Sequence, residues 1–323
     1  MKKFLKIIKW LTITIFTIIV LSILYLRFSR FSDKMIYQMN GTDYVEFKSE
    51  LNYEEFYFDV DNDVKLHGVL FKPDSITSIG TIFHYSGKGM HLMSSVQESY
   101  KPLLKKGFQV FCFERRNFGK SNGEANNSLV LKKDALFIFD KIAEMNNISE
   151  KPIIIWGQSL GGAFATMTAS ERQEKVKGLI LEGTFSSFPD IGKVYAKALN
   201  LENFKWIVPL LMNNDFPANK EIKKLNIPTI ILHSKSDQQV PYELGRNIFD
   251  SANKNNTKFW DINSKHIMGI YDYEDKYVGE FRGGSMEGKG TAIIQTVSDK
   301  IYADFDISYY LGDWKVGQFN GQG

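Results

Sequence analysis

Cysteine is almost absent from this chain of 323 residues, and so is any strong excess of charge. The one cysteine, Cys112, cannot form an internal disulfide or a CxxC metal or redox motif, and its apolar neighbours predict a buried side chain. The formal net charge is +3, and no long Lys/Arg run lies beside aromatic residues. The basic surface typical of nucleic-acid-binding proteins is therefore missing, and we expect no nucleic acid partner.

Charged side chains are also missing from residues 10–26, a stretch of 17 residues. A transmembrane helix needs about 17–25 such residues, and flanking basic side chains can lengthen the span. A cleaved signal peptide is the alternative, but "SILYLRFSRF" contains no small-x-small cleavage site. We therefore expect a basic N-terminal segment and an uncleaved anchor in residues 1–26, followed by a polar linker in residues 27–50.

Basic residues on both sides of the expected anchor indicate its orientation. Lysines at positions 2, 3, 6 and 9 precede it, whereas Arg27, Arg30 and Lys34 follow it. The more basic flank of a membrane span usually stays in the cytoplasm. The pattern predicts a single-pass membrane protein with its N-terminus in the cytoplasm and its folded part outside.

Short apolar runs alternate with helical stretches between residues 51 and 270. The runs are "VKLHGVLF", "GTIFHY", "FQVFCF", "PIIIW", "VKGLILE", "PTIILH" and "KFWDI". Nearly continuous apolar strands separated by helices predict an α/β fold whose mostly parallel sheet carries helices on both faces. Ligands of such sheets bind at the carboxyl ends of the strands, so we look for chemistry directly after each run.

The clearest such motif is "IIIWGQSLGGA", which places Ser159 between an apolar strand and a helix of small residues. The pattern Gly157-x-Ser159-x-Gly161 is typical of a nucleophile elbow, a turn too tight for side chains on both flanks. The serine hydroxyl is then exposed at the edge of the sheet, and the helix behind it favours developing negative charge. Ser159 is therefore the predicted nucleophile.

A nucleophilic serine needs a base, and in this kind of fold the chain order is Ser, Asp or Glu, then His. Only His233 and His266 follow Ser159. His233 leaves no room for an acid before it, whereas Asp237 lies in the loop after its strand and His266 in the loop after the next strand. By elimination, the predicted catalytic triad is Ser159–Asp237–His266, with His266 as the base and Asp237 as the group that orients it.

Two backbone N–H groups must stabilise the tetrahedral oxyanion. One is the amide of Leu160, directly after the nucleophile. The other is expected in the loop "FHYSGKGM", where the amide of Tyr85 is preferred and that of Ser86 is the alternative. His84 precedes the acid in the chain, so we expect it to be structural.

These residues together resemble the α/β-hydrolase superfamily, and within it the membrane-anchored serine hydrolases of the bem46-like and serine aminopeptidase-like kind. "FERRNFGKSNG" is similar to that family's Asp-x-Arg-Gly-x-Gly-x-Ser-x-Gly loop, with Glu114 and Asn117 as departures. Ser234 stands where glycine is usual, and Tyr85 replaces the glycine of a His-Gly-x-x-Gly oxyanion loop. The resemblance covers about residues 51–268 and implies neither a metal nor an organic cofactor.

The segment from about Thr184 to Lys224 is where the resemblance places a lid, and its length allows only a small one. Within it, "FKWIVPLLM" at residues 204–212 is strongly apolar. It can form an acyl-chain pocket, face a bilayer, or pack on the core as a lid helix. Together with the anchor, it leads us to expect a small-molecule acyl substrate, an ester or a thioester. A serine peptidase or aminopeptidase with the same triad, and a non-catalytic scaffold, are the alternatives.

Glycine and aromatic residues dominate the C-terminal end, where nine of the 25 glycines lie between Gly279 and Gly323. "YVGEFRGGSMEGKG" from Tyr277 and "YLGDWKVGQFNGQG" from Tyr310 share their glycines and aromatic residues at six positions, which makes them an internal repeat. Each copy is expected to form a β-hairpin, and the copies resemble the membrane occupation and recognition nexus (MORN) repeat. The second copy stops at Gly323, in the middle of the motif, so the natural protein can extend beyond this residue.

The charge of this repeat module, assigned to residues 271–323, bears on its role. Residues 277–323 contain six acidic and four basic side chains, so anionic headgroups will not attract them. A protein partner or a purely structural role is favoured. We further expect the first hairpin to pack against the hydrolase domain, assigned to residues 51–270, where the family has a terminal helix.

Overall fold

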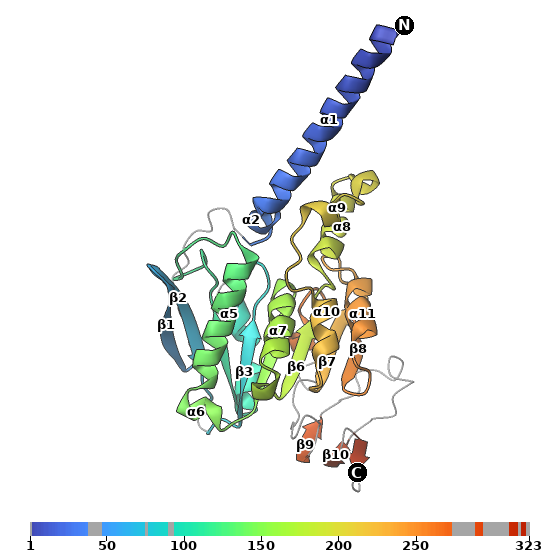
Figure 1. Cartoon of the computed structure of the whole chain (residues 1–323). Helices are drawn as coiled ribbons and strands as arrows, with labels where there is room; N and C mark the ends of the chain where they lie inside the picture. Colours follow the sequence, from blue (N-terminus) through green and yellow to red (C-terminus); the bar gives the residue numbers. More distant parts are fainter. Residues whose placement is uncertain are drawn as a thin grey trace.

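A mostly parallel sheet of eight strands is the centre of the protein (Figure 1). The computed structural model describes residues 2–37, 47–74, 77–89, 94–272, 288–292, 310–315 and 318–320. The strand order is β1-β2-β4-β3-β5-β6-β7-β8, and β2 alone runs antiparallel to both of its neighbours. The strands are β1 (Tyr53–Asp61), β2 (Val64–Phe71), β3 (Gly80–Tyr85), β4 (Phe108–Phe113), β5 (Ile153–Gln158), β6 (Gly178–Glu182), β7 (Thr229–Ser234) and β8 (Thr257–Ile262).

The seven apolar runs of the sequence form β2 to β8, as predicted. Strand β1 was not expected from the sequence, because "YEEFYFDVD" is rich in acidic residues. This strand lies at one edge of the sheet, where exposed and half-buried side chains alternate. An edge strand with one face in water carries too few apolar residues to stand out in the sequence.

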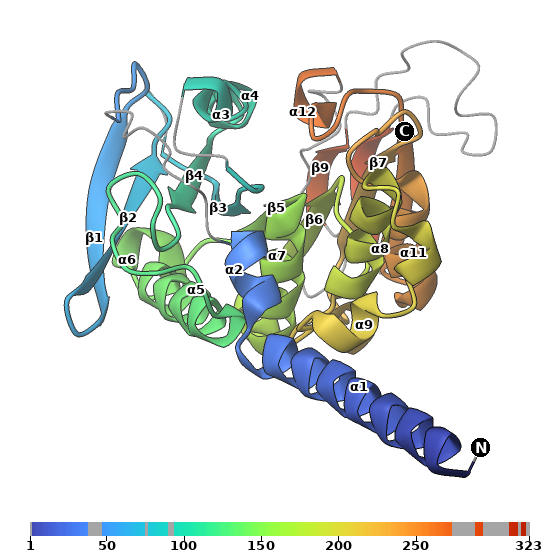
Figure 2. The same ribbon diagram turned by 90° about the horizontal axis from the view of Figure 1, so that it is seen from above.

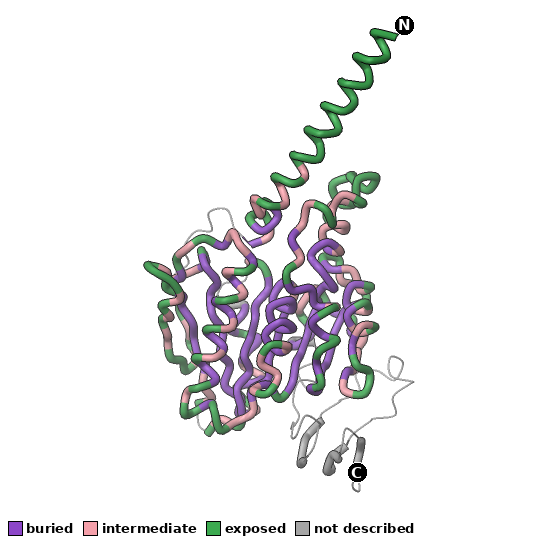
Figure 3. Tube along the Cα trace, viewed as in Figure 1, coloured by how far each residue is buried: buried purple, intermediate pink, exposed green. Residues whose placement is uncertain are grey.

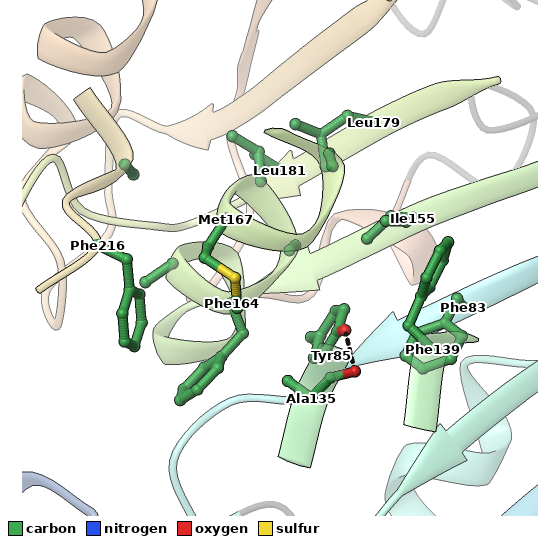
Figure 4. Packing of buried hydrophobic residues seen from close by; sticks show 14 of the residues in the cluster. Phe83, Tyr85, Ala135, Phe139, Ile155, Phe164, Met167, Leu179, Leu181 and Phe216 are labelled. Carbon is green, nitrogen blue, oxygen red and sulfur yellow. Dashed lines mark hydrogen bonds between the residues drawn. The ribbon is translucent and has the colours of Figure 1, made fainter. Parts of the chain in front are cut away.

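Helices cover both faces of the sheet and close two separate apolar cores (Figure 2). One face carries α5 (Ser128–Ala143), α7 (Leu160–Glu171), α10 (Ala218–Glu221) and α11 (Tyr242–Ser251). The other carries α3 (Ser94–Glu98), α4 (Lys101–Lys105) and α12 (Gly269–Asp272). Side chains along β5 alternate between the cores: Ile155 joins Phe83 and Phe164 in the first, seen in Figure 4, whereas Trp156 joins the second.

The lid lies between β6 and β7 and is built from two short helices, α8 (Phe188–Ala198) and α9 (Val208–Leu211). It is small, as the sequence predicts. The apolar run at residues 204–212 is not packed on the core as a lid helix, because Phe204, Trp206 and Leu210 are all exposed.

The N-terminal segment forms one long helix, α1 (Lys2–Phe28), none of whose residues is buried. Among the described residues it is the one helix long and apolar enough to cross a membrane, judged by length and composition. It projects away from the rest of the protein (Figure 1). This is the segment in which the sequence places the anchor.

The structure differs from the sequence expectation in residues 27–50, which were assigned to a polar linker. Within them α2 (Phe31–Tyr37) is a helix docked on the lid side of the sheet (Figure 2). The ring of Tyr37 is 2% exposed and makes edge contacts with Phe164 of α7 and Phe188 of α8. The polar composition of the segment hid this role, because three buried side chains, those of Ser32, Asp33 and Tyr37, are enough to hold so short a helix.

The second of these side chains is Asp33, whose carboxylate is 1% exposed. It accepts hydrogen bonds from the backbone N–H and the hydroxyl of Ser128, the first residue of α5, at 2.8 and 2.9 Å. It also accepts from the amide of Asn213 after α9, at 3.1 Å, and pairs with Arg30 at 2.7 Å. The positive end of the α5 dipole favours this charge as well. Asp33 thus joins α2 to a core helix and to the lid.

The C-terminal repeat module lies largely outside the described residues. The strands β9 (Gly288–Ala292), β10 (Tyr310–Lys315) and β11 (Gln318–Asn320) pair as an antiparallel sheet in the order β11-β10-β9. Tyr277 and most of the first copy are not described. The MORN resemblance and the packing of the first hairpin on the hydrolase domain therefore stay predictions.

Replacing Asp33 by alanine should destabilise the folded protein by about 3 kcal/mol, because it leaves buried donors on Ser128 and Asn213 without an acceptor. The thermal midpoint of the purified full chain in detergent should fall by several degrees. Asp59→Ala is the matched control, since that side chain is 78% exposed. Equal midpoints for the two variants would contradict the assigned role of Asp33.

Candidate active site

The turn between β5 and α7 holds Ser159 in a strained backbone conformation, with φ +51° and ψ −120°. Such angles are rare for a residue with a side chain and are kept only where the surroundings enforce them. A Cβ on Gly157 would stand 2.4 Å from that of Ala165, and one on Gly161 would stand 1.9 Å from the carbonyl oxygen of Tyr85. Both glycines are therefore required by the close approach of the backbone, as the motif predicts.

The end of β6 holds this turn in place. The N–H of Ser159 donates to the carbonyl of Glu182 at 2.9 Å, and the hydroxyl of Thr184 donates to the carbonyl of Ser159 at 2.7 Å. The elbow is thus bonded on both sides of its strained residue to the loop that leaves β6.

Asp237 and His266, predicted as acid and base, lie in direct contact. Nδ1 of His266 is 2.6 Å from Oδ2 of Asp237, which follows β7, while His266 follows β8. The other carboxylate oxygen of Asp237 accepts from the N–H groups of Gln239 and Val240, both at 2.9 Å. Burial alone would raise the pKa of Asp237, but the bonds from His266 and Val240 outweigh it, so that its pKa is lowered. An ionised Asp237 accepts from Nδ1 of His266, which leaves the lone pair of an uncharged imidazole on Nε2.

The ring of His266 also lies against the loop that holds the elbow. A Cβ built on Gly183 would stand 3.2 Å from Nδ1 of His266. Gly183 lies between Glu182 and Thr184, the two residues that bond the backbone of Ser159. The structure therefore brings all three predicted triad residues to one edge of the sheet, around the end of β6.

Glu182 is a residue of this site that the sequence analysis missed. Its carboxyl group is buried and accepts from the side-chain amide of Gln158 at 2.8 Å and from the N–H of Gly269 at 2.7 Å. Burial raises the pKa of this carboxyl group despite these hydrogen bonds. A charged residue at the carboxyl end of a buried strand was the available signal.

The backbone directly after His266 is strained as well, since Ile267 has φ +51°. A branched residue adopts such an angle only when neighbouring contacts impose it. Gln158, which precedes the nucleophile, donates to the carbonyl of Ile267 at 3.3 Å, and Glu182 accepts from the N–H of Gly269 at 2.7 Å. The histidine loop is therefore held by the elbow and by the end of β6.

Ser234, noted as a departure from the family pattern, connects the acid loop to the histidine loop. Its hydroxyl donates to the carbonyl of Ser264 at 2.6 Å and accepts from the N–H of Ser264 and Ser236. A glycine at this position could make none of these side-chain bonds. The serine thus adds a link between the segments that carry Asp237 and His266.

The two other described histidines near this edge are buried and act in packing. His84 lies between the hydroxyl of Tyr100 and the side-chain oxygen of Gln158, and burial lowers its pKa to about 3. His233 donates from Nε2 to the carbonyl of Val240, and burial lowers its pKa too. Among the described residues no cluster of three or more His, Cys, Asp or Glu side chains could hold a metal ion.

The two candidate oxyanion donors at the end of β3, the N–H groups of Tyr85 and Ser86, differ in their backbone surroundings. Tyr85 is the last residue of β3 and is paired with Gly157 of β5. The ladder starts where Thr81 donates to the carbonyl of Pro152, and its two-residue period directs the N–H of Tyr85 toward β5. Ser86 follows the strand. The phenol of Tyr85 is buried in the core, 2.8 Å from the hydroxyl of Thr168 and 3.4 Å from the carbonyl of Ala135 (Figure 4).

Arg115 supports this loop and was not singled out by the sequence analysis. Its guanidinium group is buried and donates to the carbonyls of Ser86 and Gly87, both at 3.0 Å. Among the residues that the structure describes, its Nε has no hydrogen-bond partner, and burial lowers the pKa of Arg115 to about 10. The ring of Phe164 lies under the guanidinium group, 5.9 Å away. Arg115 therefore acts as a fixed donor to the loop that follows β3.

The other departures from the family loop keep its turn. Asn117, at a usual glycine, has φ +62°, a left-handed conformation that asparagine tolerates better than most residues. Glu114 accepts from the N–H of Lys120 at 2.8 Å, and a Cβ on Gly119 would stand 1.9 Å from its carboxylate. Glu114 also contacts the buried His67, at 2.9 Å. These residues pack the loop and lie away from the elbow.

Known proteins resemble this chain in sequence and in fold. The family model described as "alpha/beta hydrolase fold" matches residues 83–201. The lysophosphatidylserine lipase ABHD12 of Danio rerio is 31% identical over 47% of this chain and 42% of its own length. That of Rattus norvegicus is 31% identical over 56% and 47%, and Protein ABHD12B of Homo sapiens is 29% identical over 53% and 49%. The chain thus matches less than half of the length of these relatives.

Solved structures show the same fold over more of the chain. The Pyrococcus furiosus esterase Pf2001 superposes with a TM-score of 0.58 at 19% identity and covers 75% of this chain and 95% of its own. Est1E from Butyrivibrio proteoclasticus, with bound ferulic acid, has a TM-score of 0.53 at 18% identity, over 65% and 90%. The protein has the α/β-hydrolase fold, and lipases are among its relatives in sequence.

The lowered pKa of Asp237 predicts how stability depends on pH. A carboxyl group with a lowered pKa stabilises the fold above its unfolded pKa, about 4, and this contribution is lost as the pH falls toward the folded value. Asp237→Ala should therefore cost about 2 kcal/mol at pH 7 and progressively less below about pH 4. Thermal midpoints measured from pH 3 to pH 8 check this, with Asp250→Ala, an exposed acid, as the control. A cost that stays constant over this range would contradict it.

Proposed function

We propose that this protein is a membrane-anchored serine hydrolase that cleaves acyl esters or thioesters with Ser159, His266 and Asp237 as its catalytic triad. The observation that carries the proposal is the 2.6 Å contact between His266 and Asp237, on loops that adjoin the strained turn of Ser159. Two strained backbone positions, at Ser159 and Ile267, frame the proposed nucleophile and base. Strain of this kind is kept where function needs a fixed geometry.

The proposed reaction has two steps. In the first, Ser159 Oγ attacks the acyl carbon while its proton passes to Nε2 of His266, and the leaving alcohol or thiol takes that proton. In the second, water attacks the acyl carbon of the acyl-serine while one of its protons passes to Nε2 of His266. The carboxylic acid then leaves, and His266 returns that proton to Oγ of Ser159. Asp237 stays ionised throughout and stabilises the imidazolium that forms in each step.

The negative oxygen of each tetrahedral intermediate needs two donors. The N–H of Leu160, at the start of α7, is the first in our proposal. Of the two groups that the sequence left open for the second, the strand register favours Ser86 over Tyr85, because the ladder with β5 engages the amide of Tyr85. Arg115 acts through this loop by holding its carbonyls, which makes it a positioning residue.

The acyl class of substrate rests on the character of the chain around the site. The lid is apolar and exposed, and α1 is long and apolar enough to serve as an anchor. The relatives named lysophosphatidylserine lipase hydrolyse, by that name, an ester of a membrane lipid. These points favour a lipid-like ester over a peptide, although the triad itself would serve either.

A fluorophosphonate probe should label the wild-type chain and not Ser159→Ala, because only an activated serine reacts with it. A panel of acyl esters, thioesters and aminoacyl amides then tests the substrate class, and esters or thioesters should be turned over. Absence of serine-dependent labelling would indicate a non-catalytic scaffold. Turnover of the amides alone would indicate a peptidase and overturn the ester assignment.

Arg115→Lys should lower kcat by about tenfold and change KM little, because a lysine cannot hold both loop carbonyls and the oxyanion donor is then misplaced. Arg116→Lys is the matched control, since Arg116 is equally buried but pairs with Asp134 at 2.7 Å. The control should lose stability without this loss of kcat at a temperature where both variants stay folded. A larger effect on KM than on kcat would sink the positioning role of Arg115.

A further inference from the structure

The far end of the lid is exposed (Figure 3), and it carries large apolar side chains that the fold does not bury. We call residues 195–210 the lid tip. Its exposed apolar residues are Tyr195, Leu199, Leu201, Phe204, Trp206 and Leu210, each between 47% and 69% exposed. So many exposed apolar side chains in one short segment are unusual for a surface that faces only water.

The lid tip is a built structure and not a loose loop. The first turn of α8 is fixed in the core by Phe188 and Ile191, both buried. A Cβ on Gly192 would stand 2.2 Å from the sulfur of Met212 and 2.9 Å from Val208, so α8 and the segment around α9 are in close contact. The apolar side chains of the tip are therefore held on the outside by the packing of the lid itself.

The lid tip stands beside the base of α1 (Figures 1 and 2). Arg27, in the last turn of α1, donates to the carbonyls of Met212 and Pro209, the latter at 3.3 Å. Ser32, in α2, accepts from the N–H of Asn213 at 3.1 Å. These bonds fix the direction of the lid relative to the helix that carries the exposed apolar residues Tyr25 and Phe28.

The composition of the tip matches the surface layer of a bilayer. Tryptophan and tyrosine favour the membrane–water boundary, where their rings meet both apolar and polar surroundings. Residues 195–210 contain two lysines and one glutamate, so the tip carries no net negative charge that anionic headgroups would repel. Lysine stems can also lie along the apolar layer while their ammonium groups reach water.

We infer that the lid tip is inserted into the boundary layer of the bilayer that α1 crosses, so that the lid lies on the membrane itself. This inference rests on the anchor of the proposed function. The exposed apolar surface of the tip continues that of α1, so one bilayer can cover both.

Site-directed spin labelling of the full chain in liposomes tests this directly. Cys112 is 2% exposed, so the unsubstituted chain should take up little label. Three single variants are compared: Trp206→Cys in the lid tip, Ile18→Cys within α1, and Tyr57→Cys on β1 as a water-exposed control. Collision with oxygen and with a water-soluble nickel chelate reports the depth of each label.

The label at position 206 should lie roughly 5–10 Å inside the headgroup boundary, shallower than that at position 18, while the label at position 57 stays in water. A label at position 206 that matches the water-exposed control would overturn the inference. So would shielding from both reagents, which would indicate a protein contact, or a water-exposed label at position 18. Because the readout involves no catalysis, its failure is distinct from a failure to label Ser159.

Discussion

The site depends on one buried carboxyl group, that of Glu182 at the end of β6. It accepts a hydrogen bond from the side chain of Gln158, the residue before the nucleophile. It accepts another from the N–H of Gly269, in the loop that carries His266. Its own backbone carbonyl accepts from Ser159. Two strained turns from distant parts of the chain are therefore bonded to one residue. This fixes the position of the proposed nucleophile relative to the proposed base.

This arrangement lets loops hold a geometry that loops alone would not keep. The strands β5, β6, β7 and β8 are adjacent and parallel, so their carboxyl ends deliver Ser159, Glu182, Asp237 and His266 to the same edge. Side-chain bonds then connect neighbouring loops in pairs, as Ser234 does between the last two. The sheet sets the spacing, and the polar contacts set the orientation.

Much of this could be predicted from local sequence, because strands β2 to β8 are apolar runs and the elbow is a compact motif. The order of residues along the chain was enough to select Asp237 and His266 as candidates. Contacts between residues that are distant in the chain could not be predicted from the sequence. The role of Asp33 depends on Ser128 and Asn213, far away in the chain, and that of Arg115 depends on two carbonyls in the loop after the neighbouring strand β3. Neither residue belongs to a local pattern.

The docking of α2 has a mechanical consequence. A domain on a free tether can turn in any direction, whereas Asp33 and Tyr37 tie the base of α1 to α5, α7 and the lid at once. In the membrane-anchored protein that we propose, the tilt of α1 would then set the tilt of the whole sheet and the height of the edge with Ser159. A change in bilayer thickness that tilts α1 would then change the distance between this edge and the membrane surface.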